Sequence, residues 1–174
     1  MCKPISNLRI NAIVEESIVD GPGIRYTIFV QGCPHRCKDC FNPQTHTFNS
    51  GYEVDTDYLF SKINKNLLIT GVTFSGGEPM CQARGLSVLA EKINSIGLEL
   101  AIYTGYTLEQ LLKERNKDRH KLLTLCDVLI DGRFKVTEHS LALRFRGSSN
   151  QRILDAKQSL KFKTPIFIAN DNWI

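Results

Sequence analysis

The sequence lacks any apolar run approaching the roughly 18 residues that cross a bilayer. Its first residues, Met1 to Glu16, contain no uninterrupted apolar segment of signal-peptide length. Internal repeats, low-complexity segments and long linkers are also absent from it. At 174 residues the chain can bury one hydrophobic core, so we expect a single domain over residues 1–174, in the cytoplasm and without a membrane partner.

The sequence also lacks a long block of basic residues. Its formal net charge is +4, but Lys and Arg are spread among Asp and Glu along the chain. This distribution is typical of a solvated mixed surface and disfavours a nucleic-acid partner.

The six cysteines are unevenly spaced, which disfavours three disulfides in a chain without a signal peptide. Three of them form the run Cys33-Pro-His-Arg-Cys37-Lys-Asp-Cys40. Thiolates at CxxxCxxC spacing can bind three irons of a cubane [4Fe–4S] cluster and leave the fourth iron open for a substrate. Cys2, Cys81 and Cys126 are interpreted as structural or incidental thiols.

A structural zinc site is the alternative, with His35, His46 or a distant cysteine as the fourth ligand. Zinc sites usually pair two cysteine knuckles, or one knuckle with two histidines, and the sequence supplies no such second half. The pattern therefore favours the iron–sulfur cluster.

Hydrophobic periodicity predicts alternating strands and helices. The expected strands are Leu8 to Val14, Ile24 to Val30, Ile69 to Phe74, Leu98 to Tyr103 and Cys126 to Ile130, with weaker candidates at Arg152 to Ala156 and Pro165 to Ala169. Helices are expected after a cap at Asp55 or Thr56, along an apolar stripe ending near Gly97, and from the capping box Thr107-Leu-Glu-Gln110.

Repeated strand–helix units predict an α/β fold with a mostly parallel sheet, because parallel neighbours need a crossover. A full eight-unit barrel takes about 250 residues, so this chain supports only about five or six units. We expect an incomplete (β/α)6-type partial TIM barrel, with its chemistry at the C-terminal ends of the strands.

Two polar turns follow predicted strands. In Ser75-Gly-Gly-Glu-Pro79 the glycines permit close approach of a cofactor, and Glu78 can accept from an ammonium group; a simple tight turn is the alternative. Asp131-Gly-Arg133 places an acid and a base where they could hold a cofactor's hydroxyl and carboxylate, with a solvated loop as the alternative.

The cysteine motif, together with Gly76-Gly-Glu-Pro79, resembles the radical S-adenosylmethionine superfamily. More narrowly, the chain is similar to the activating proteins of anaerobic ribonucleoside-triphosphate reductases over roughly Leu8 to Asp155, and residues 156–174 have no placed counterpart. The segments that carry this resemblance are Asp20-Gly-Pro-Gly-Ile-Arg25, Gln31-Gly-Cys-Pro-His-Arg-Cys37, Cys40-Phe-Asn-Pro43, Thr104-Gly-Tyr-Thr107, Val128-Leu-Ile-Asp-Gly132 and Arg146-Gly-Ser-Ser-Asn-Gln151.

The resemblance implies an oxidoreductase with two cofactors, a [4Fe–4S] cluster and S-adenosyl-L-methionine. Reductive cleavage of the latter to a 5′-deoxyadenosyl radical would generate a glycyl radical near the C-terminus of the reductase. It also implies a low-potential electron donor such as flavodoxin, and an open barrel that admits a glycine loop of another protein.

Family roles carry over to particular positions of this sequence. Cys33, Cys37 and Cys40 become the cluster ligands, and Gly76, Gly77 and Glu78 meet the methionine amino group. Asp39, Cys40 and Phe41 fall where the family's loop approaches adenine, although many members have an apolar or aromatic residue in place of Asp39. Asp131 and Arg133 fall where related activases use an acid and a base against S-adenosylmethionine.

The nearest rival is an activase of pyruvate formate-lyase or another glycyl-radical enzyme, which shares the cysteine and Gly-Gly-Glu-Pro motifs. It is usually longer, and Arg146-Gly-Ser-Ser-Asn-Gln151 argues against it. A non-catalytic zinc-binding interaction module is the alternative from another class.

Overall fold

The structure is a computed structural model that describes residues 7–170, 172 and 173, so Cys2 lies outside the described residues. Its strands are β1 (Asn7–Ser17), β2 (Arg25–Val30), β3 (Tyr52–Asp55), β4 (Gly71–Gly76), β5 (Glu99–Thr104), β6 (Val128–Asp131) and β7 (Arg152–Asp155). Its α-helices are α1 (Thr56–Lys65), α2 (Ala83–Ser95), α3 (Leu108–Lys113), α4 (Lys117–Leu125) and α5 (Ala156–Phe162). Three short 3₁₀ helices are η1 (Pro43–Thr45), η2 (Pro79–Gln82) and η3 (Val136–Glu138).

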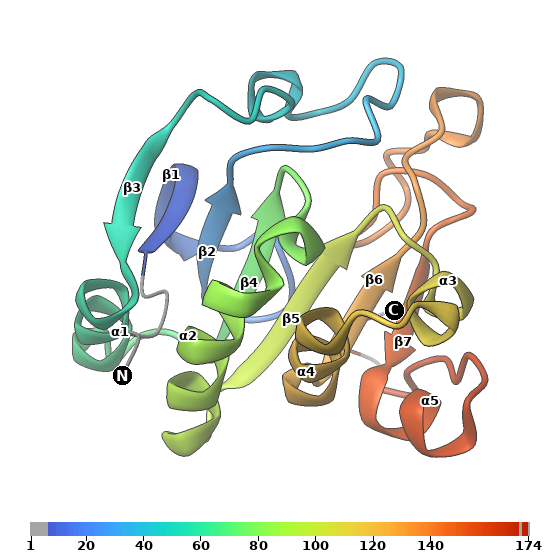
Figure 1. The fold of residues 1–174 in the computed structure, drawn as a ribbon. Coiled ribbons are helices and arrows are strands. Elements are labelled where there is room, and N and C mark those ends of the chain that lie inside the picture. The colour runs from blue at the N-terminus through green and yellow to red at the C-terminus, as the bar shows by residue number, and fades with distance from the viewer. Residues whose placement is uncertain (1–6, 171, 174) are drawn as a thin grey trace.

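The strands form one open seven-stranded sheet in the order β3-β1-β2-β4-β5-β6-β7 (Figure 1). The four central strands β2, β4, β5 and β6 run parallel, which confirms the α/β class and the parallel centre. The outer strands β1, β3 and β7 pair antiparallel with their neighbours. The sheet is therefore mixed, with a parallel centre and antiparallel edges.

Local capping explains where the helices begin. The Asp55 carboxylate accepts from the backbone N–H groups of Asp57 and Tyr58 and so caps α1. Thr107 and Gln110 form the predicted reciprocal capping box at the start of α3. Gly97 follows α2 with a φ of +77°, as a glycine after a helix end commonly does.

Alternation along the strands divides the sheet into two faces. The main core lies between the sheet and the helices, where Ile28, Phe74 and Ile102 pack with the buried side of α2, including Leu86 and Leu89. Figure 1 shows the helices on this side of the sheet. Because the neighbouring strand positions point the other way, Phe29, Ser75 and Tyr103 face the opposite, inner side.

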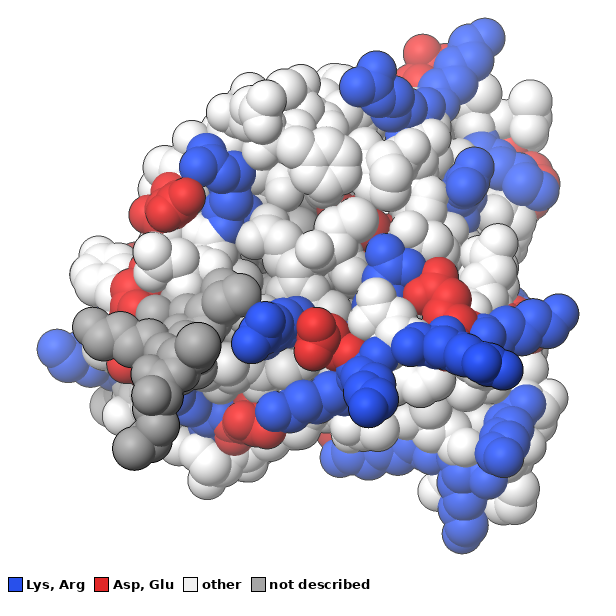
Figure 2. All heavy atoms as spheres, in the orientation of Figure 1, with Lys and Arg blue, Asp and Glu red and all other residues white. Residues whose placement is uncertain are grey.

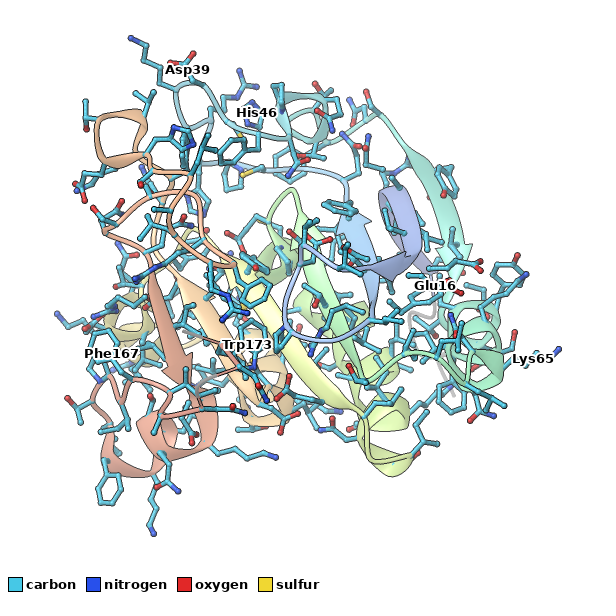
Figure 3. The ribbon with its side chains drawn as sticks, turned by 180° about the vertical axis from the view of Figure 1, so that it is seen from behind. Glu16, Asp39, His46, Lys65, Phe167 and Trp173 are labelled. Carbon is cyan, nitrogen blue, oxygen red and sulfur yellow. The ribbon has the colours of Figure 1, made fainter. Side chains whose placement is uncertain are left out.

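A second apolar cluster covers the inner face at β5, β6 and β7. It contains Ala101, Val128, Ile130 and Ile153, with Trp173 from the C-terminal segment packed on them. The Trp173 ring is fully buried, lies 5.4 Å from the Arg25 guanidinium and meets the Phe145 ring edge-on. The C-terminal segment thus returns to the sheet and closes one end of the inner face (Figure 3).

Two features of the chain after β6 differ from the predictions. The segment 165–169 is not a strand, because it contributes only an isolated bridge between Phe167 and Leu154. The predicted strand at Arg152 to Ala156 is present as β7, but it runs antiparallel to β6. The connection from β6 to β7 holds only η3 and loop, so no helix crosses the sheet there.

The parallel register brings four strand ends to the same edge of the sheet. Val30 of β2 lies beside Gly76 of β4, and Thr104 of β5 lies beside Asp131 of β6. The segments that follow these residues include the cysteine loop and the Gly-Gly turn, so both motifs meet at this edge, as the sequence predicts.

Within the described residues, none of the helices combines the length and the apolar character that a membrane crossing needs. On the face seen in Figure 2, Lys and Arg side chains are interspersed with Asp and Glu.

Candidate functional site

The cysteine loop leaves β2 in a tightly turned path. Gly32 has a φ of +95°, and Arg36 and Asp39 adopt the left-handed conformation with φ of 47° and 55°. The loop is tied to η1 by backbone hydrogen bonds from Gly32 N–H to Thr45 O and from Cys33 N–H to His46 O. These constraints fix the direction in which the first cysteine enters the site.

The three thiols of the motif differ in burial. Cys33 is 9% exposed, and Cys37 and Cys40 are half-buried. Burial raises the pKa of the Cys33 and Cys37 thiols above the ordinary cysteine value. The backbone N–H of Asn42 points at Cys40 Sγ, 3.4 Å away, so the loop already directs a donor toward sulfur.

A cavity of about 820 Å³ opens at this edge of the sheet. Cys33, Cys37 and Cys40 line it together with the Gly-Gly turn. The loops after β1 and after β6 supply its outer walls, including the exposed apolar side chains of Ile18 and Leu141. The cavity thus joins the cysteine motif to an apolar opening on the surface.

Gly76 and Gly77 line the same cavity as the cysteines. A Cβ on Gly77 would lie 2.4 Å from the carbonyl oxygen of Gly32, and one on Gly76 would lie 2.6 Å from Phe29 Cα. Both glycines therefore let this turn pack against β2 and the start of the cysteine loop. The same absence of side chains exposes backbone to the cavity.

Glu78, predicted to receive an ammonium group, is fully buried and lies behind the cavity wall. Its carboxylate accepts hydrogen bonds from Thr104 Oγ1 and from the backbone N–H groups of Met80 and Gly105. His35 Nε2 lies 2.7 Å from the second carboxylate oxygen. Glu78 thereby ties together the Gly-Gly turn, the end of β5 and the cysteine loop.

His35, considered in the sequence only as a ligand of the alternative zinc site, and Thr104, not predicted as a site residue, both line the cavity and both contact Glu78. His35 packs edge-on against Tyr106, with ring centroids 4.6 Å apart. His35 lies inside the cysteine motif, and Thr104 directly follows the predicted strand Leu98 to Tyr103. The place of His35 in the cysteine motif, and that of Thr104 at the C-terminal end of a strand, are the features of the sequence that could have predicted both as site residues.

Asp131 is also fully buried and does not line the cavity. Its carboxylate accepts from the guanidinium of Arg152 and from the backbone N–H of Leu108. Arg152 in turn forms two hydrogen bonds to Glu109, which lower the pKa of Glu109 to about 2, while both carboxylates raise the pKa of Arg152. Asp131 thus joins β6, β7 and α3.

Of the remaining predicted residues, Arg133 and Phe41 line the cavity and Asp39 does not. Phe41 packs against Phe134, with ring centroids 4.9 Å apart, so it connects the cysteine loop to the segment after β6. Asp39 is exposed on the outer side of the loop (Figure 3).

The donor chemistry of the cavity fits an iron–sulfur cluster. In a cubane each thiolate binds a different iron, so the ligands have to surround a space, and all three motif thiols line this one. Across residues 7–170, 172 and 173, no three His, Cys, Asp or Glu side chains converge as the ligands of a single metal ion would.

Comparison with known proteins agrees with this chemistry. Residues 19–154 match the family described as 4Fe-4S single cluster domain. An anaerobic ribonucleoside-triphosphate reductase-activating protein of Vibrio cholerae is 37% identical over 146 residues, covering 78% of this chain and 90% of that protein. The protein of the same name from Escherichia coli K12 is 34% identical, covering 77% of this chain and 90% of that protein.

The chain belongs to the family of anaerobic ribonucleoside-triphosphate reductase-activating proteins. The predicted resemblance is confirmed, and the family carries a [4Fe–4S] cluster. A pyruvate formate-lyase-activating enzyme of Clostridium pasteurianum is also similar, at 36% identity over 129 residues, but this chain spans only 52% of it. The chain is therefore also similar to a protein of the predicted rival class.

Proposed function

We propose that this chain is a radical S-adenosylmethionine enzyme that generates a glycyl radical on an anaerobic ribonucleoside-triphosphate reductase. The observation that carries the proposal is the cavity that the three motif cysteines line together with the Gly-Gly turn at the C-terminal edge of the parallel strands. The family relationship supplies the activated partner. We also propose that the open sheet is the incomplete (β/α)6 barrel of one domain spanning residues 1–174.

In this proposal Cys33, Cys37 and Cys40 would hold the cluster, and the Gly-Gly turn would bind S-adenosylmethionine. When bound, these cofactors supply a one-electron cleavage of the sulfonium that releases methionine and leaves a 5′-deoxyadenosyl radical able to take hydrogen from a glycine Cα. Backbone carbonyl groups at Gly76 and Gly77 offer acceptors for the methionine ammonium group. Glu78 supports this contact by holding the turn in place.

The remaining predicted residues take places around the cofactor. Arg133 at the cavity wall offers a cation to a carboxylate, and Phe41, beside Cys40, offers an apolar surface to adenine. Asp131 forms an ion pair with Arg152, and this pair holds the C-terminal end of β6 in place. Arg133 follows two residues later, so Asp131 helps to position it. Asp39 lies on the outer side of the loop, and its left-handed backbone conformation helps to turn the loop before Cys40.

Apolar side chains at the mouth of the cavity support a protein substrate. Val19 and Leu141 are 72% and 92% exposed and stand on loops that line the same opening. An open sheet leaves this side accessible, so a glycine-bearing loop of the reductase can enter laterally. A low-potential donor such as flavodoxin, in the cytoplasm, would supply the electron.

Activation of pyruvate formate-lyase is the second candidate, supported by the Clostridium pasteurianum relative. The segment 146–151, one of those that carry the resemblance to the reductase-activating proteins, favours the reductase, and it also builds part of this chain's cavity wall. There Arg146 donates to Gln151 O, and Gln151 Oε1 accepts from the N–H groups of Gly147 and Ser148.

The test is anaerobic reconstitution with iron and sulfide, followed by reduction in the presence of S-adenosylmethionine and a candidate reductase. We expect 5′-deoxyadenosine and a glycyl doublet in the electron paramagnetic resonance spectrum. Pyruvate formate-lyase in place of the reductase is the control. A doublet on that enzyme alone would favour the second candidate, and stoichiometric zinc with no nucleoside formed would favour a binding module.

A further inference from the structure

Trp173 lies on the inner face of the sheet, where its backbone is tied to β7. Ile168 N–H donates to Ile153 O of β7, and Trp173 N–H donates to Asn170 O. The indole is fully buried in the apolar cluster on this face. Figure 3 shows it between the loop that follows β1 and the loops that follow β6. The ring is therefore placed to contact both sides of the inner face.

One side of the indole contacts the loop between β1 and β2. The loop passes so close that a Cβ on Gly21 would lie 2.8 Å from the ring atom Cη2. The guanidinium of Arg25, at the end of this loop, lies 5.4 Å from the ring centroid and makes a cation–π contact. The exposed side chains of Ile18 and Val19 belong to the same loop and line the cavity. The indole thus supports the loop that carries these two apolar side chains.

The other side of the indole contacts the loop between β6 and β7. The Phe145 ring meets the indole edge-on, with ring centroids 5.5 Å apart. The Tyr103 hydroxyl on β5 donates to Phe145 O at 2.7 Å. Phe145 has a φ of 53°, a conformation that residues other than glycine adopt rarely and only where their surroundings hold them. The exposed Leu141 stands on this loop and lines the cavity.

A single buried side chain therefore supports two of the loops that border the mouth of the cavity. We propose that Trp173 is a positioning residue for the protein substrate. Through its contacts with both loops it keeps Ile18, Val19 and Leu141 in the arrangement that receives the glycine-bearing segment of the reductase. This inference rests on the proposed function, because it takes the reductase as the occupant of the mouth.

The expected effect follows from preorganisation. An apolar surface that is already ordered binds more tightly than one that has to be ordered on binding, because the cost of ordering is subtracted from the binding free energy. Without the indole, both loops border a void into which they can relax. The cysteine loop is held separately, by η1 and by the bond between His35 and Glu78. Loss of the indole should therefore weaken binding of the reductase more than it impairs the cluster.

The test compares wild type with Trp173→Ala, Trp173→Phe and Tyr103→Phe after anaerobic reconstitution. Trp173→Phe keeps an aromatic ring but loses the reach of the indole. Tyr103→Phe leaves the indole in place and removes only the hydrogen bond to Phe145 O. Phe162→Ala is the control, because this exposed aromatic side chain on α5 does not line the cavity.

Two properties are measured on each protein. Calorimetric titration of the cluster-loaded protein with the reductase gives the dissociation constant. Glycyl radical formation at increasing reductase concentration gives KM and kcat. Iron content and circular dichroism supply the fraction of each protein that is folded and loaded, and kcat is counted per molecule in that fraction.

We expect the dissociation constant and KM for the reductase to rise about tenfold in Trp173→Ala and about threefold in Trp173→Phe and Tyr103→Phe. In each variant kcat should fall by a smaller factor than KM rises. Phe162→Ala should match wild type. A merely structural role would lower the folded fraction and leave the dissociation constant of the folded protein unchanged.

Equal dissociation constants in wild type, Trp173→Phe and Tyr103→Phe would overturn the inference and leave the proposed function standing. These two variants decide the question if Trp173→Ala does not fold. Failure of wild type itself to form a glycyl radical on the reductase would overturn the proposed function and this inference together.

Discussion

His35 and Glu78 are joined by a hydrogen bond of 2.7 Å between His35 Nε2 and Glu78 Oε2, with side chains that are 4% and 0% exposed. One residue stands inside the cysteine motif and the other inside the Gly-Gly-Glu-Pro turn. The two motifs that identify the family are therefore bonded to each other in the fold. The bond ties the cysteine loop to the turn, and the Glu78 carboxylate lies outside the lining of the cavity.

Glu78→Gln tests how much this junction contributes to stability. Both carboxylate oxygens accept hydrogen bonds from buried donors, and an amide can keep only one acceptor oxygen. We expect the free energy of unfolding, measured by urea denaturation, to fall by about 2 kcal/mol. Glu53→Gln is the control, because its ion pair with Arg9 is exposed and should contribute little. Equal losses in the two variants would contradict the structural role of Glu78.

Gly77→Ala tests the close approach between the turn and the cysteine loop. The new Cβ would lie 2.4 Å from the backbone oxygen of Gly32, and hydrogen bonds from Gly77 N–H to Val30 O and from Gly32 N–H to Thr45 O hold both backbones in place. We expect a loss of about 2 kcal/mol or more in the free energy of unfolding. Gly97→Ala is the matched control: its φ of +77° is unfavourable for alanine, but no atom lies within 4 Å of the new Cβ. There the loss should be about 1 kcal/mol, and a reversed order would refute the steric argument.

The sequence predicted the central strands and the capped helices because their signals are local. The reciprocal Thr107 and Gln110 bonds depend on residues three apart, and the β4 strand depends on its own apolar run. The α4 helix was not predicted, since its fully buried side chains, Leu122 and Leu123, are adjacent and give no helical period. In α5 the buried residues are Ala156 and Ser159, which are too small to form an apolar stripe.

The placement of the site residues depended on long-range register. The cysteine loop and the Gly-Gly turn could be brought to one edge from the sequence, because parallel strands end on the same side. The partner of Asp131 could not be predicted, since Arg152 reaches it only because β7 pairs antiparallel with β6 and sets the two residues side by side. The burial of Glu78 likewise requires knowing that Thr104 and His35 converge on it from two other elements.

Cys37→Ala should abolish cluster binding and leave the fold intact, because Cys37 is half-buried in a loop at the edge of the sheet. We expect iron content near zero after reconstitution, no reduced-cluster signal, and a far-ultraviolet circular dichroism spectrum like that of wild type. Cys126→Ala is the opposite control. Cys126 is fully buried in the main core, so this variant should bind iron normally but lose about 1 kcal/mol of stability. Retained 5′-deoxyadenosine production by Cys37→Ala would contradict its assignment as a ligand.

Glu109 predicts a specific pH dependence of stability. Its hydrogen bonds to Arg152 lower its pKa from 4.5 to about 2, so its stabilising contribution is complete above pH 4.5 and is lost as the pH falls through about 2. The difference in unfolding free energy between wild type and Glu109→Gln should therefore be constant from pH 7 to 5 and shrink toward pH 2. Since Glu109 is 46% exposed, solvent screening limits this difference to below about 1 kcal/mol.

Urea denaturation at pH 6, 4 and 2.5 measures the effect of Glu109→Gln. Glu16→Gln, at an exposed position of β1, is the charge-matched control. The difference between that variant and wild type should change less over the same range. A difference for Glu109→Gln that grows toward low pH would show that Arg152 does not stabilise the ionised carboxylate.

Trp173→Ala tests whether the C-terminal segment belongs to the fold. The indole is fully buried over the inner face of the sheet and contacts both Arg25 and Phe145, and Phe145 also lines the cavity. Removing it leaves a void between the sheet and the cavity wall, so we expect a loss of about 3 kcal/mol in unfolding free energy. Trp173→Phe, which keeps an aromatic ring, should lose about 1 kcal/mol.

Because Trp173 is the sole tryptophan of the chain, circular dichroism rather than fluorescence must follow the unfolding of both variants. A Trp173→Ala protein as stable as wild type would mean that the inner face holds together without the C-terminal segment.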